Sequence, residues 1–63
     1  MKKVTIAKYV VYTKNELTAK IDIDGKVDIY VDGLFSCIRR FRHEAKAFRF
    51  FEKQGWEFEG LIY

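Results

Sequence analysis

Between residues 17 and 31 the sequence alternates strictly between apolar and polar side chains. A pattern of period two with one apolar side is typical of antiparallel strands that pack on one face. We therefore expect two strands joined by a short loop over residues 24–26, with Ile23 opposite Val27. The apolar positions that share this parity are Leu17, Ala19, Ile21, Ile23, Val27, Ile29 and Val31.

Two more segments predict strands in the same sheet. Residues 4–13, "VTIAKYVVYT", are rich in β-branched and aromatic side chains, which favour strands. Residues 56–63, "WEFEGLIY", alternate again and predict a closing strand. Lys8 interrupts the apolar parity of the first segment, which indicates a bulge or an edge position.

A fourth strand is expected over residues 34–41. The dipeptide Asp-Gly at 32–33 is a strong signal for a tight type I′ hairpin, and the apolar run that follows it would complete the hairpin. Ser36 and Ile38 would lie on its buried side. The alternative for this segment is a longer helix that Ser36 caps.

Residues 42–54 predict a helix. At 100° per residue, Ala47, Phe48 and Phe51 fall on one side, whereas Phe50 falls outside that side. The glycine that follows the helix stands where a left-handed cap belongs, so the next residue, a tryptophan, would pack back on the last turn.

The expected element order is β-β-β-β-α-β, or β-β-β-α-β if residues 34–41 join the helix. Either order gives an α+β fold. It consists of a small, mostly antiparallel sheet of four to five strands with one helix packed on its apolar face. We expect residues 1–63 to form a single domain, because a chain of this length has no room for a second.

The size of the chain limits its core. Domains of about 60 residues bury only about 60% of their unfolded surface, so a homodimer is one way to complete the core. The single cysteine, Cys37, excludes an internal disulfide and indicates a reducing, cytoplasmic location. No segment approaches the length of a membrane span, so we expect no membrane partner.

The aspartates around the first glycine suggest a calcium loop, but the spacing excludes an EF-hand. If Gly25 takes position 6 of such a loop, Asp22 and Asp24 take positions 3 and 5. Lys20 then occupies position 1 and Val31 occupies position 12, and neither can ligate calcium. We therefore expect no metal site and no cofactor.

Catalytic residues are not evident either. His43 is the only histidine and Cys37 the only thiol, with Ser36 beside it. No acid is placed to orient a base toward a nucleophile. We therefore expect no catalytic residues and a protein that is not an enzyme.

Basic residues gather on the predicted helix. Their spacing of three and four residues puts them within about 60° of one another, opposite the apolar side. Two arginines just before the helix extend the group. Such a surface either is solvated or binds phosphates or an acidic partner. These residues are Arg39, Arg40, Arg42, Lys46, Arg49 and Lys53.

Acidic residues share the outward parity of the predicted strands, so we expect an acidic outer sheet face. A similar order of strands and helix occurs in PUR-type repeats, which bind single strands on a basic, aromatic sheet face. That similarity covers most of the chain but rests on no motif, and the acidic parity argues against that mode. The acids are Asp22, Asp24, Asp28, Asp32, Glu57 and Glu59.

Two functions follow from this segregation of charge. The first is a non-enzymatic protein-interaction module, such as a regulator, inhibitor or adaptor of the kind that mobile elements encode. The second is a nucleic-acid-binding accessory protein that uses the basic helix face. The first is preferred, because a net charge of +3 is low for a dedicated nucleic-acid binder.

Overall fold

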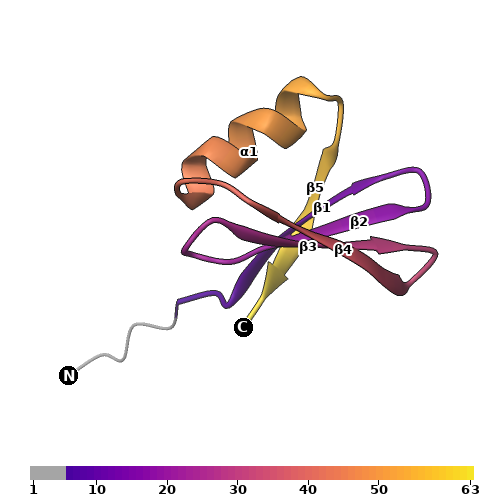
Figure 1. The fold of residues 1–63 in the computed structure, drawn as a ribbon, viewed down its shortest axis with the longest axis horizontal. Helices are drawn as coiled ribbons and strands as arrows, with labels where there is room; N and C mark the ends of the chain where they lie inside the picture. The colour runs from indigo at the N-terminus through magenta and orange to yellow at the C-terminus, as the bar shows by residue number, and fades with distance from the viewer. Residues whose placement is uncertain (1–5) are drawn as a thin grey trace.

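The computed structural model describes residues 6–63 and contains one antiparallel sheet with one helix over one of its faces (Figure 1). The predicted α+β fold and the order β-β-β-β-α-β are confirmed, and the segment after Gly33 is a strand, not a helix. The elements are β1 (Tyr9–Lys14), β2 (Leu17–Ile21), β3 (Lys26–Val31), β4 (Leu34–Arg40), α1 (Glu44–Lys53) and β5 (Glu57–Ile62).

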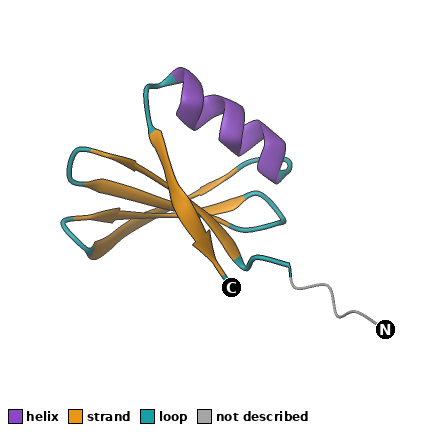
Figure 2. Cartoon of the chain, turned by 180° about the vertical axis from the view of Figure 1, so that it is seen from behind, coloured by secondary structure: helices purple, strands orange, loops and turns teal. Residues whose placement is uncertain are grey.

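The sheet has the strand order β4-β3-β2-β1-β5, and every neighbouring pair is antiparallel. The first four strands follow one another as a meander. The chain then leaves the sheet at its β4 edge, crosses as α1, and returns at the opposite edge, where β5 pairs with β1 (Figure 2). The helix therefore connects the two edges of the sheet.

The predicted pairing of Ile23 with Val27 is wrong. Ile21 lies opposite Val27, and Ile23 is exposed in the turn. The cause is Asp22, whose carboxylate oxygen accepts backbone N–H groups from two and four residues further on, at 2.9 and 3.2 Å. These bonds begin the turn two residues earlier than the apolar alternation predicts.

The Asp-Gly hairpin forms as predicted. Asp32 and Gly33 have φ angles of 52° and 80°, as a type I′ turn requires at both central positions. Val31 lies opposite Leu34, so this turn joins β3 and β4 with no further loop residues.

The prediction that Ser36 and Ile38 lie on the buried side of β4 is wrong. The ladder between β3 and β4 shifts between Phe35 and Cys37, so Ser36 is an extra residue and the parity after it is reversed. Cys37 lies opposite the buried Ile29 on the helix side of the sheet, and Ile38 belongs to the outer face. All residues of β4 are exposed.

The first strand begins at Tyr9, later than the sequence pattern predicts. Part of the predicted strand, residues 4 and 5, lies outside the described residues. The backbone N–H of Lys8 donates to the carbonyl of Ile62 at 2.6 Å, so the pairing with β5 extends just beyond the start of β1.

The helix is shorter than the predicted range of 42–54 by two residues at its start and one at its end. Ala47 and Phe51 are buried against the sheet as predicted, and they join a core contributed by the middle strands. The described core consists of Tyr12, Ala19, Ile21, Val27, Ile29, Ala47 and Phe51.

The end of the helix has the predicted cap. Gly55 has a φ of 85°, and the N–H of Trp56 donates to the carbonyl of Phe51 at 2.9 Å. This six-to-one bond is that of a Schellman motif. The rings of Phe51 and Trp56 are in contact at a centroid distance of 4.7 Å, and Lys14 Nζ donates to the carbonyl of Gln54 at 2.7 Å.

Tyr12 connects the sheet to the helix and should give the fold a measurable pH dependence. Its hydroxyl donates to a Glu52 carboxylate oxygen at 2.7 Å. Burial, with the hydrogen bond and charge of Glu52 adding to it, raises the pKa of Tyr12 from 10.0 to about 12. The folded state therefore holds a proton that the unfolded state releases near pH 10.

We expect the stability contributed by this raised pKa to be present below about pH 10 and to be lost as the pH rises to about 12. Urea unfolding of the protein and of Tyr12→Phe across this range would measure it, because the phenylalanine variant lacks the titration. Tyr30→Phe, on the outer sheet face, is the matched control. A parallel loss of stability in the protein and in Tyr12→Phe would contradict the assignment.

Candidate partner-binding edge

Strand β4 is an edge strand with an apolar surface. Within residues 6–63 it has a neighbouring strand on the β3 side only. Leu34, Phe35 and Ile38 are 74%, 56% and 44% exposed, which is high for side chains of this size. Long apolar edge strands are templates for pairing with another chain, so β4 is the first candidate for a binding surface.

The backbone of β4 offers hydrogen-bonding groups on its outer side. Residues of an antiparallel strand alternate between bonding to a neighbour and pointing away from it. The N–H of Phe41, just past the end of β4, donates to the carbonyl of Gly25 at 2.8 Å. By alternation, the N–H groups of Ile38 and Arg40 point away from β3, toward the side where a further strand would add.

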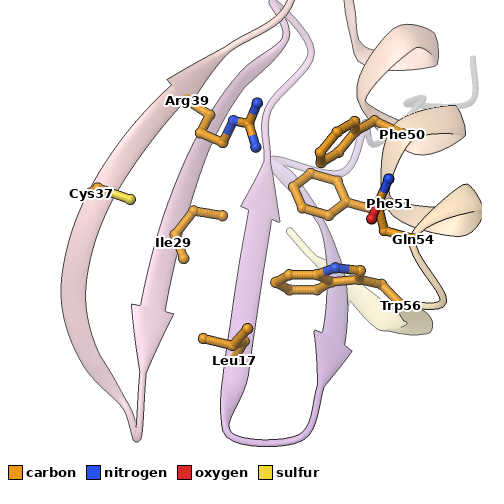
Figure 3. A pocket seen from close by; sticks show the side chains of 8 residues that line it. All are labelled: Leu17, Ile29, Cys37, Arg39, Phe50, Phe51, Gln54 and Trp56. Carbon is orange, nitrogen blue, oxygen red and sulfur yellow. The ribbon is translucent and has the colours of Figure 1, made fainter.

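A groove lies between α1 and the helix side of β3 and β4 (Figure 3). Its volume is about 310 Å³, and its walls are mostly apolar. Sheet residues form one wall, and the last turn of the helix with the tryptophan that follows it forms the other. The lining residues are Leu17, Ile29, Cys37, Arg39, Phe50, Phe51, Gln54 and Trp56.

Arg39 marks one end of this groove. Its guanidinium carbon lies 4.6 Å from the centroid of the Phe50 ring and 5.6 Å from that of Phe41. A guanidinium that stacks on aromatic rings keeps N–H donors at its edge for other partners. The stacking therefore holds a cation in a defined place beside an apolar groove.

The prediction that Phe50 lies away from the buried side is wrong. Phe50 is half-buried and packs against the core, with its ring 5.2 Å from that of Phe51 and 5.4 Å from that of Phe41. The segment that leads from β4 into the helix turns Phe41 toward this side of α1. Helical spacing alone could not show that contact.

The predicted basic residues do not form one surface. Lys46, Arg49 and Lys53 are exposed on α1, at helical positions opposite the buried side. Arg42 precedes the helix and is also exposed. The two arginines of β4 lie on opposite faces of the sheet. Arg39 shares the helix side with the groove, while Arg40 lies opposite Lys26 in the ladder and belongs to the outer face.

The predicted acidic residues lie in three places. Asp28 is on the outer face, where it lies between Lys20 and Ile38 in the ladder. The two glutamates of β5 lie near Thr13, which pairs with Glu57 and donates to the Glu59 carboxylate at 3.4 Å. The remaining acids, Asp22, Asp24 and Asp32, lie in turns at the two ends of β3.

The residues considered for catalysis or metal binding stand apart. His43 is the exposed N-cap residue of α1, and Cys37 is exposed in the middle of β4. In the described part of the chain, no three His, Cys, Asp or Glu side chains are grouped so that they could hold a metal ion. Over residues 6–63, the length and hydropathy of a transmembrane helix are not reached by any helix.

Comparisons with protein-family models, with curated proteins and with solved structures found no match for this chain.

The apolar surface of β4 is the part of the candidate site that reasoning from sequence missed. The signal was present in "LFSCI", residues 34–38, where apolar side chains occur on both parities. A strand covered on one face shows one apolar parity, so two apolar parities indicate that the second side also needs a partner.

Proposed function

We propose that this chain is a non-enzymatic protein-interaction module that binds an extended segment of another protein along β4. The observation that carries the proposal is the seven-residue edge strand with every residue exposed and with outward-pointing N–H groups. Adding a strand to such an edge supplies main-chain hydrogen bonds, and side chains at alternate positions supply specificity. Binding of this kind suits a regulator, inhibitor or adaptor, because it needs no catalytic group.

The test blocks the addition of a strand at β4 while the fold is retained. Proline is tolerated in an edge strand where its missing N–H would face solvent. Ile38→Pro therefore deletes an outward donor and blocks the approach of a partner strand, while Ile38→Thr keeps the donor and the β-branched shape. Circular dichroism should show that both variants are folded.

The measurement is capture of a protein from an extract of the source cells by the immobilised chain. We expect Ile38→Pro to lose the captured protein, and Ile38→Thr to retain it. Arg49→Glu, on the far side of the helix, should also retain it. Equal capture by Ile38→Pro and the unmodified chain would contradict binding along β4.

Nucleic-acid binding by the helix face is the second candidate, supported by the exposure of Lys46, Arg49 and Lys53 on one side of α1. It predicts the reverse pattern of binding for Ile38→Pro and Arg49→Glu. Affinity for a generic duplex or single strand would fall steeply with salt and would be lost in Arg49→Glu but not in Ile38→Pro. Absence of binding at low salt would remove this candidate.

A further inference from the structure

Strand β4 has two chemically different halves. From Leu34 to Ile38 every side chain but one is apolar, and the strand ends with Arg39 and Arg40. Outside the bulge at Ser36, a strand that adds to this edge places each of its residues directly beside one residue of β4, with Cβ atoms about 4.5–5.5 Å apart. The side chains of the partner are therefore selected position by position.

The cationic end selects for carboxylates on both faces. Arg39 lies on the helix side, and Arg40 lies on the outer face. Two successive acidic residues in an extended partner would meet one arginine each, because neighbouring side chains of a strand point to opposite faces. Opposite charges in directly paired positions are favourable, and like charges are unfavourable.

The apolar half selects for a large side chain opposite Cys37. Cys37 is the small side chain of β4 that lines the groove (Figure 3). A partner residue beside it also points to the helix side and can lean over the cysteine toward the groove. The volume of about 310 Å³ accommodates a large aliphatic or aromatic side chain, since it is at the lower end of the range for small-molecule pockets.

We infer that the partner segment of β4 is an extended strand with two adjacent carboxylates opposite Arg39 and Arg40 and apolar residues opposite the rest, one of which enters the groove beside Cys37. This inference rests on the proposed function, because it specifies the chemistry of the segment that binds there. The partner is thus an acidic and apolar segment of another protein.

A second copy of this chain fits the edge less well. Antiparallel pairing of two β4 strands over their full length is centred on Cys37. The arginine end of each strand then lies beside the Leu34–Phe35 end of the second copy. The arginines of both copies meet apolar side chains instead of carboxylates, so charge complementarity favours a different protein.

The test uses synthetic peptides and the fluorescence of Trp56, which lines the groove and is the only tryptophan of the chain. The peptides are blocked, as long as β4 and free of tryptophan. They carry two glutamates at one end and apolar residues elsewhere, in both chain directions. Matched peptides carry lysines in place of the glutamates.

We expect a glutamate peptide to change the Trp56 emission and to bind about tenfold more tightly than its lysine counterpart, equivalent to about 1.4 kcal/mol. The double variant Arg39→Gln/Arg40→Gln should lose this preference, whereas Arg49→Gln should keep it. Added salt should reduce the preference, because exposed ion pairs are screened.

The outcomes separate this inference from the proposed function. Equal binding of glutamate and lysine peptides would overturn the acidic specificity and leave binding along β4 intact. If no peptide binds while Ile38→Pro still abolishes protein capture, the acidic specificity is likewise overturned and binding along β4 stays intact. If no peptide binds and Ile38→Pro captures the protein normally, both the inference and the proposed function are contradicted. Sedimentation showing a dimer that Ile38→Pro dissociates would overturn the inference in favour of a second copy.

Discussion

Phe51→Ala should lose a large part of the free energy of unfolding of this protein. Phe51 is 1% exposed, and its ring packs with those of Tyr12, Phe41 and Trp56. Truncating a buried phenylalanine costs about 3–5 kcal/mol. At about 0.05–0.15 kcal/mol per residue, a chain of this length has a total stability of roughly 3–9 kcal/mol, so the loss removes a large part of it.

Urea or thermal unfolding followed by circular dichroism would measure this loss. Phe58→Ala is the matched control, because Phe58 is 58% exposed although its ring also contacts that of Tyr12. We expect it to unfold cooperatively with a loss of about 1 kcal/mol. A cooperative transition of Phe51→Ala within about 1 kcal/mol of the unmodified protein would contradict the central role of this ring.

Gly25→Ala should be almost as damaging, although it adds only a methyl group. Gly25 has a φ of 89°, and a Cβ atom built on it would lie 2.6 Å from the carbonyl oxygen of Phe41 and 3.0 Å from backbone atoms of His43. Left-handed backbone costs an alanine about 1–2 kcal/mol, and here the clash with backbone adds to it. The turn between β2 and β3 must then separate from the segment that begins the helix.

We expect a loss of more than about 2 kcal/mol for Gly25→Ala, measured by urea unfolding. Gly33→Ala isolates the conformational cost, because Gly33 has a φ of 80° and, apart from its chain neighbours, no atom lies within 4 Å of the position that a methyl group would take. That variant should lose only the conformational cost of about 1–2 kcal/mol. Equal losses in the two variants would show that close packing at Gly25 has no effect.

The proposed binding mode joins these features to function. The close approach at Gly25 fixes the chain between β4 and α1, and Phe51 supports the helical wall of the groove. Both substitutions should therefore weaken peptide binding in proportion to the unfolded fraction, whereas Ile38→Pro should weaken it with the fold retained. Comparing binding with unfolding in the same samples distinguishes these two causes.

Features that depend on neighbours along the chain could be predicted from the amino-acid pattern alone. Alternation of apolar residues predicts the strands. The Asp-Gly dipeptide predicts the type I′ turn at Asp32, and the glycine after the helix predicts the cap that Trp56 completes. Each follows from backbone preference or side-chain period within a few residues, so the α+β fold and its element order were predictable.

Features that depend on residues far away in the sequence became visible only in the folded chain. The extra residue at Ser36 reversed the parity of β4. Phe50 and Arg39 came together because the segment after β4 turns Phe41 toward α1. The candidate site consists of these features. A bulge or an aromatic contact is selected by the packing across the sheet, whose partners a one-dimensional pattern does not contain.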